Sequence, residues 1–194
     1  MDRTTRQMRS IASDFKTREA EDGLYIEGYF SVFNTIYELW PGATESVAPG
    51  AFANALGDDI RALIDHETRL VLGRNKAGTL ELREDAHGLW GKIRINPNDV
   101  DAMNLYERVK RGDVDQCSFG FEIVNEETDF REDGSIHWTI REVRLYEVSV
   151  VTFPAYEETS VSARKQQYEE IQKRKNEKWQ LDMKNRLKGA PHGT

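Results

Sequence analysis

Short apolar runs alternate with turn signals along most of the chain. The run LYIEGYFSVF at 24–33 is aromatic and β-branched, which is typical of a strand, and its internal Gly28 indicates a bulge or a barrel corner. In LWGKIRI at 89–95, the alternation places Leu89, Ile93 and Ile95 on one face. Further strands are predicted at 60–65, 70–73, 79–84, 117–124, 135–140 and 142–153, with a hairpin around 132–134.

Helical periodicity occurs in one long segment. Apolar residues recur between 100 and 110 at helix spacing, after a cap at Asn98 or Asp99 and before a terminating Gly112. A second, short helix is predicted at 51–56, AFANAL, because Pro49 and Gly50 precede it. The segment between residues 35 and 50 is predicted to be a loop.

About seven short strands with two helices predict a mainly β fold with helices (α+β). The expected architecture is a small closed β-barrel decorated by helices, since regular β-α-β alternation is absent. Three parts are expected: a mobile N-terminal arm at 1–22, the barrel domain at 23–163, and a charged tail at 164–194 that is a helix or disordered.

Composition narrows the class of protein. The 194 residues suit a single domain, and the single cysteine, Cys117, fits a reducing compartment. No signal peptide or membrane span is expected, because no long apolar run occurs. Residues 164–194 carry nine Lys/Arg and four Asp/Glu, a net charge of +5, whereas residues 1–163 carry 18 and 30, a net charge of −12. Nucleic-acid binding by the main body is therefore not expected.

The candidate chemistry is nucleophilic catalysis. The four histidines lack the short spacing of a metal site, one cysteine cannot make a thiolate cluster, and no phosphate-binding glycine loop occurs, so no metal or cofactor is expected. Acyl transfer needs a nucleophile, a base, a group that orients the base and donors for the oxyanion. Ser118 begins an apolar strand and His66 ends another, but spacing alone leaves both open to structural roles.

Four blocks of sequence, taken together, resemble the prohead proteases of tailed double-stranded DNA bacteriophages. They lie in the family's order between residues 23 and 160: GYFSVFN, APGAF, LIDHETRLVLG, and SFGF followed by LYEVSVVTFPAY. That family is similar in fold to the herpesvirus assembly protease, a seven-stranded barrel surrounded by helices. The resemblance implies a serine endopeptidase that cuts capsid and scaffold segments inside the immature shell.

The resemblance also implies residue roles. His66 matches the family's base and Ser118 its nucleophile. Where the herpesvirus enzyme has a second histidine, this chain offers Glu147, to which we assign the orienting role. A structural ion pair of Glu147 with Arg141 or Arg144 is the alternative reading. The loop after the strand, at Ala155 and Tyr156, is expected to supply the oxyanion donor.

Cys117 is a rival nucleophile, since a Cys–His protease also fits a reducing compartment. Adjacent strand residues point to opposite faces, so if Ser118 faces the cleft, Cys117 faces the core. Ser118 is preferred on this ground.

The expected partners are the major capsid protein, its scaffold segment and the chain itself as substrate, with homo-oligomerisation left open. The expected location is the host cytoplasm, inside the prohead. Two other functions stay open: a catalytically silent scaffolding protein on the same barrel, and nucleic-acid binding through the basic tail, which a salt-dependent affinity would reveal.

Overall fold

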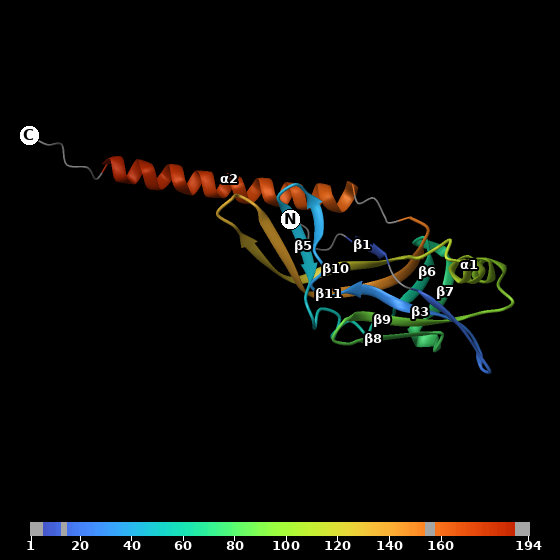
Figure 1. The fold of residues 1–194 in the computed structure, drawn as a ribbon. Coiled ribbons are helices and arrows are strands. Elements are labelled where there is room, and N and C mark those ends of the chain that lie inside the picture. Colours follow the sequence, from blue (N-terminus) through green and yellow to red (C-terminus); the bar gives the residue numbers. More distant parts are fainter. Residues whose placement is uncertain (1–5, 13–14, 154–157, 189–194) are drawn as a thin grey trace, which may run out of the picture. The chain divides into compact units, whose positions relative to one another are not determined.

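The computed structural model describes residues 6–12, 15–153 and 158–188. The chain divides into two compact units, with the boundary between residues 157 and 158. The first unit contains all the strands and the helix α1, and the second contains the helix α2 (Figure 1).

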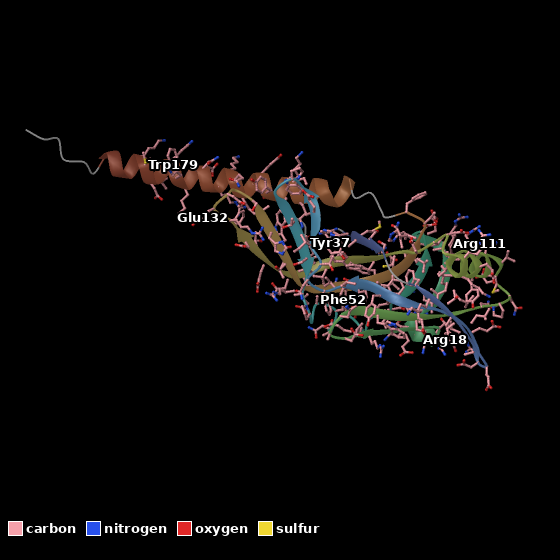
Figure 2. The ribbon with its side chains drawn as sticks, in the orientation of Figure 1. Arg18, Tyr37, Phe52, Arg111, Glu132 and Trp179 are labelled. Atoms are coloured by element: carbon pink, nitrogen blue, oxygen red, sulfur yellow. The ribbon has the colours of Figure 1, made fainter. Side chains whose placement is uncertain are left out.

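The larger of two sheets is built around the long hairpin of β10 and β11. The strand order is β1-β10-β11-β5-β4. The first part of β11 pairs in parallel with β5, and its last part pairs in parallel with β6. β6 pairs in turn with β7. The strands are β1 (Gln7–Ala12), β4 (Tyr37–Trp40), β5 (Ala43–Val47), β6 (Arg61–Ile64), β7 (Glu67–Arg74), β10 (Gln116–Phe130) and β11 (Ile136–Val151). Glu132 lies at the tip of the hairpin (Figure 2).

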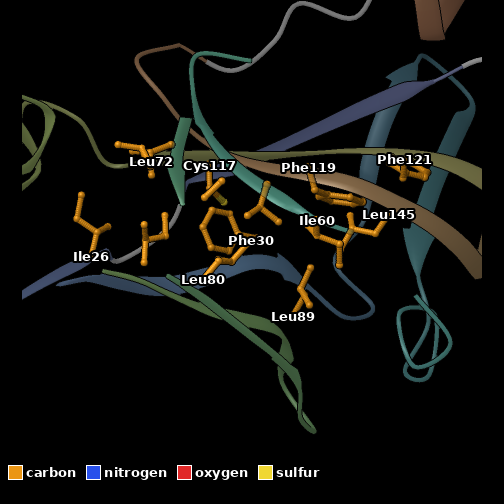
Figure 3. Close-up of a cluster of buried hydrophobic side chains, with 14 of the residues drawn as sticks. Ile26, Phe30, Ile60, Leu72, Leu80, Leu89, Cys117, Phe119, Phe121 and Leu145 are labelled. Carbon is orange, nitrogen blue, oxygen red and sulfur yellow. The ribbon is translucent and has the colours of Figure 1, made fainter. Parts of the chain in front are cut away.

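The smaller sheet is antiparallel and has the order β2-β3-β9-β8. Its strands are β2 (Lys16–Ala20), β3 (Gly23–Val32), β8 (Leu80–Glu84) and β9 (Gly88–Ile95). Side chains from both sheets form one core: Ile26, Phe30 and Leu89 from this sheet meet Cys117 and Phe119 from β10 (Figure 3). Burying such apolar surface is the main force that holds the two sheets together.

The predicted closed barrel is not what the strand pairing gives. Among the described residues, β3 pairs only with β2 and β9, and β10 pairs only with β1 and β11, so the hydrogen bonding of the two sheets stays separate. The mainly β class with helices is confirmed. The apolar alternation was read correctly, but it does not determine which strand edges pair.

The N-terminal residues also differ from the expected mobile arm at 1–22. β1 and β2 lie within this range, and each is hydrogen-bonded into one of the two sheets. A buried ion pair ties β1 to β5, with 2.5 Å between Arg9 Nε and Glu45 Oε1. Removing one partner of such a pair leaves an uncompensated buried charge and costs about 3–5 kcal/mol.

Two other segments depart from the predictions. The segment predicted as a loop at 35–50 contains the short strands β4 and β5. The segment 51–56, which was predicted to be a helix, is a series of turns. Its Phe52 is nevertheless fully buried in the core. The apolar content of AFANAL was therefore a core signal rather than a helix signal.

The helix α1 (Val100–Arg111) lies where it was predicted. The Asp99 side chain accepts hydrogen bonds from the backbone N–H groups of Asp101 and Ala102, and Gly112 ends the helix in the left-handed conformation. A 3₁₀ turn, η1, spans Asn75–Ala77.

The helix α2 (Glu158–Lys188) spans most of the tail that was predicted to be helical or disordered. No helix among the described residues is long and apolar enough to cross a membrane.

Candidate active site

Glu147 reaches its position through a bulge in β11. Gly120 and Phe121 of β10 are neighbours, but their partners on β11 are Glu147 and Leu145, so Tyr146 is an extra residue. The bulge changes the phase of the alternation: Leu145 and Val148 both belong to the core. Glu147 therefore faces away from the core, where strict alternation from Leu145 would have turned it inward.

His66 is carried by the two-residue turn that joins β6 to β7. The turn residues, Asp65 and His66, have φ angles of 47° and 61°. Positive φ at both central positions is the requirement of a type I′ hairpin turn. Aspartate, asparagine and histidine are the non-glycine residues most often found at positive φ, so both residues of this turn suit its backbone.

A continuous hydrogen-bonded network joins three side chains. His66 Nδ1 lies 2.8 Å from Glu147 Oε1, and the Ser149 hydroxyl donates to Glu147 Oε2 at 2.5 Å. Because an ionised carboxylate only accepts hydrogen bonds, the proton of the neutral imidazole lies on Nδ1. The lone pair of the ring is then on Nε2, where a general base needs it.

Ser118 lies on the same side of the sheet as this network. It pairs with Ser149 across β10 and β11, two residues from the pair of Gly120 with Glu147. Directly paired residues on one face have Cβ atoms about 4.5–5.5 Å apart. Ser118 Oγ and His66 Nε2 are both buried, and neither has a hydrogen-bond partner among the described residues.

Cys117 faces the opposite side, as predicted. It belongs to the buried core, and its thiol donates to the backbone oxygen of Tyr29 at 3.2 Å (Figure 3). The rival nucleophile thus has no access to His66 from its own face of the strand.

The arginines that offered a structural partner for Glu147 bind elsewhere. Arg141 donates to Glu127 at 2.8 Å, and Arg144 lies 3.5 Å from Glu122, so both pair with β10 carboxylates. The imidazole that bonds to Glu147 is that of His66, whose side chain is 17% exposed, against 6% for the side chain of the glutamate.

A pocket of about 240 Å³ adjoins this network. Its lining combines the apolar Leu63 and Val71 with Arg61, Tyr146 and Glu147. The expected oxyanion donors, Ala155 and Tyr156, lie outside the described residues.

Comparison with known proteins places the chain in a family. The profile of the caudovirus prohead serine proteases matches residues 13–174, which is most of the chain. The chain belongs to this family. The chain is also 31% identical over 153 residues to the prohead protease of Enterobacteria phage HK97, an alignment that covers 77% of this chain and 63% of that relative.

The fold has a counterpart among solved structures. The bacteriophage T4 capsid assembly protease superposes with a TM-score of 0.51 and 10% sequence identity, over 75% of this chain and 96% of that one. Because the identity is low, this likeness concerns the fold alone and not the residues of the site.

Sequence reasoning missed two residues beside Glu147. Ser149, two residues further along the strand, lies on the same face, which the period of two could have indicated. Gly120, inside the SFGF block, lies directly opposite Glu147. The bulge in β11 that creates this pairing leaves no clear signal in the sequence.

Proposed function

We propose that this chain is a serine endopeptidase in which Ser118 is the nucleophile, His66 the general base and Glu147 the group that orients the base. The observation that carries the proposal is the 2.8 Å contact between His66 Nδ1 and Glu147 Oε1, with Ser118 on the same sheet face. Acyl transfer requires an imidazole oriented by an acid, which His66 and Glu147 supply, and a hydroxyl nucleophile, for which Ser118 on the same sheet face is the candidate.

The chemistry follows the acyl-enzyme route. His66 Nε2 takes the hydroxyl proton as Ser118 Oγ attacks the scissile carbonyl carbon, and Glu147 stabilises the imidazolium that forms. The C–N bond then breaks, and Nε2 gives the proton to the leaving amine. Water, activated by the same nitrogen, hydrolyses the ester on Ser118. Backbone N–H groups at Ala155 or Tyr156 are the proposed oxyanion donors.

The proposed substrates are extended segments of the capsid protein, of its scaffold and of the chain itself, cleaved inside a prohead in the host cytoplasm. The pocket beside Glu147 would hold one substrate side chain, and its apolar and charged lining suits a long residue with a polar end. Ser118 has no exposed surface, so a substrate carbonyl reaches it only after the residues that cover it move.

Co-expression with the capsid protein of the same phage tests this function, with the masses of all products as the measurement. Wild-type protein should shorten the capsid protein, whereas Ser118→Ala and His66→Asn should each leave it intact. Asparagine is chosen at residue 66 because it tolerates positive φ, so that the turn survives. Combining the two changes should add little, because nucleophile and base act as a unit.

Cys117→Ala is the matched control, since it alters the neighbouring residue on the opposite face. It should keep processing and labelling by a fluorophosphonate probe, while Ser118→Ala loses both. Cleavage by Ser118→Ala at a rate near wild type refutes the nucleophile. Absence of labelling in wild-type protein, free or assembled, would instead support a catalytically silent scaffolding protein.

A further inference from the structure

Gly120 lies where the site leaves no room for a side chain. A Cβ atom built on Gly120 would collide with Glu147 Oε1, and would also lie 3.1 Å from Cδ and 3.2 Å from Cγ of the same residue. The colliding oxygen is the one that accepts the hydrogen bond from His66 Nδ1. Glycine inside a strand often marks such a close approach.

The carboxylate cannot easily move aside, because both of its oxygens are occupied. Oε1 bonds to His66 and Oε2 accepts from the Ser149 hydroxyl at 2.5 Å. Ser149 is fully buried, and its backbone is fixed by pairing with Ser118 on one side and Leu63 on the other. The carboxylate is thus held by a hydroxyl of its own strand and faces the backbone of Gly120 on the neighbouring strand.

We infer that Gly120 and Ser149 are positioning residues for the protease: the missing side chain at 120 makes the space for the Glu147 carboxylate, and the Ser149 hydroxyl fixes its rotation toward His66. This inference rests on the proposed function. It assigns a physical role to the glycine of the SFGF block, two residues after the nucleophile on the same face.

The geometry predicts an unusual phenotype for Gly120→Ala. The backbone of Gly120 is an ordinary strand conformation without positive φ, so alanine is compatible with it. The atoms that must yield belong to the end of a glutamate side chain, not to backbone. The fold should therefore survive while the carboxylate is displaced from His66.

The experiment is a double-mutant cycle between Gly120→Ala and Glu147→Ala, read out as the second-order rate of Ser118 labelling by a fluorophosphonate and as the cleavage rate of co-expressed capsid protein. Gly120→Ala should lower both rates by about 10²–10⁴-fold, the range expected when the orienting acid is lost. In the Glu147→Ala background the same change should lower them by less than about threefold, because the atoms it displaces are gone. Ser149→Ala should give a smaller loss.

A spectroscopic readout separates positioning from general structural damage. The downfield Nδ1 proton resonance of His66 should be present in wild type and absent in Gly120→Ala, although the two proteins have similar urea midpoints. Gly57→Ala is the matched control, since a Cβ there meets nothing within 4 Å. It should leave the resonance and both rates unchanged.

The outcomes distinguish this inference from the proposed function. Wild-type rates for Gly120→Ala, with an inactive Glu147→Ala, overturn the role of Gly120 and leave the catalytic assignment standing. Wild-type rates for Glu147→Ala overturn the assignment of Glu147 and the inference with it. If Gly120→Ala fails to fold, recovery of the fold in the double variant supports the collision with Glu147, and failure to recover overturns it.

Discussion

His137 shows how a polar side chain is accommodated in this sheet. Its Nδ1 lies 2.8 Å from Thr44 Oγ1 and its Nε2 lies 2.9 Å from Ser46 Oγ, so both ring nitrogens bond to hydroxyls of the neighbouring strand β5. Burial lowers the pKa of His137, and the positive charge of Arg131 lowers it further, while Asp129 and Glu45 act in the opposite direction. The fold therefore favours the neutral ring.

The lowered pKa of His137 predicts that this residue makes the protein less stable in acid. Between the folded pKa and the unfolded value of about 6.5, the unfolded chain binds more protons, so stability falls as the pH decreases through this window. The measurement is the urea midpoint of wild type and His137→Gln at pH values from 8 to 5. The wild-type midpoint should fall more steeply than that of the variant. Parallel curves would show that His137 does not contribute.

Other residues at this scale could be assigned to faces from the sequence. The alternation correctly put Cys117 in the core, opposite Ser118. Contacts between side chains of distant segments could not be predicted from the alternation. The histidine that bonds to Glu147 is 81 positions away, and neither segment alone indicates the strand register that brings the two residues together. The resemblance to a family supplied the pairing that periodicity could not.

At the scale of elements, the β6–β7 turn is fastened to the end of β11. The backbone N–H of Asp65 donates to the Val150 oxygen at 3.0 Å. The Asp65 carboxylate accepts from the Thr152 backbone N–H at 2.6 Å and from its hydroxyl at 3.1 Å. The turn that carries His66 is thus tied to the strand that carries Glu147.

This fastening predicts different effects for two substitutions of Asp65. Asp65→Gly keeps the positive-φ backbone but removes the carboxylate, so the turn should loosen and fluorophosphonate labelling of Ser118 should slow by about tenfold, or about 1.4 kcal/mol in the activation barrier. Asp65→Asn retains an acceptor for the Thr152 N–H and tolerates the same backbone, so it should stay within about threefold of wild type. Equal labelling rates for wild type and Asp65→Gly would mean that the turn holds His66 without the tie.

Element prediction succeeded where the local signal was strong and failed where neighbours decide. The sequence of α1 contains a capping residue, Asp99, an apolar face and a terminating glycine, Gly112. Both ends of this helix were therefore predicted to within one residue. The strands β4 and β5 are short, and Pro41 and Gly42 lie between them, so the composition of this segment resembles that of a loop. The bulge at Tyr146 depends on the register against β10.

At the scale of the whole molecule, the sequence could place apolar faces but not sheet edges. Phe30 and Phe119 belong to one core whether their strands close a barrel or form two packed sheets. The two arrangements differ in their main-chain hydrogen bonds. Every residue can make such bonds, apart from the N–H donor that proline lacks, so the composition does not indicate which strands pair. Gly28 predicts a bulge or a barrel corner; it pairs with Gly91, and the register of this strand pair shifts just after it, between Tyr29 and Ser31.

The tail differs from the rest of the chain in both charge and organisation. α2 belongs to a compact unit separate from the strands, and the net charge of +5 at 164–194 opposes −12 in the remainder. Its exposed Trp179, Leu181 and Met183 come from one stretch of an otherwise polar helix; Trp179 is visible as a projecting side chain (Figure 2). The tail has four alternative roles. It is a solvated helix with no other role, a segment that docks on acidic scaffold or capsid surfaces, a self-cleaved extension, or a segment that binds nucleic acid.

Deleting residues 164–194 separates these alternatives. The truncated protein should keep the urea midpoint of the strand unit and its fluorophosphonate labelling, because α2 is a unit of its own. Docking predicts that the truncated protein is packaged less into proheads. It predicts the same for the triple variant Lys173→Gln/Arg174→Gln/Lys178→Gln, which removes three positive charges but keeps the helix. Self-cleavage predicts instead that active protein shortens near residues 160–170 while Ser118→Ala stays full length.

DNA binding that weakens steeply with salt and disappears on truncation would identify nucleic acid as the partner of the tail. Normal packaging of both variants, with an intact wild-type tail in mature particles and no such DNA binding, leaves α2 as a solvated helix.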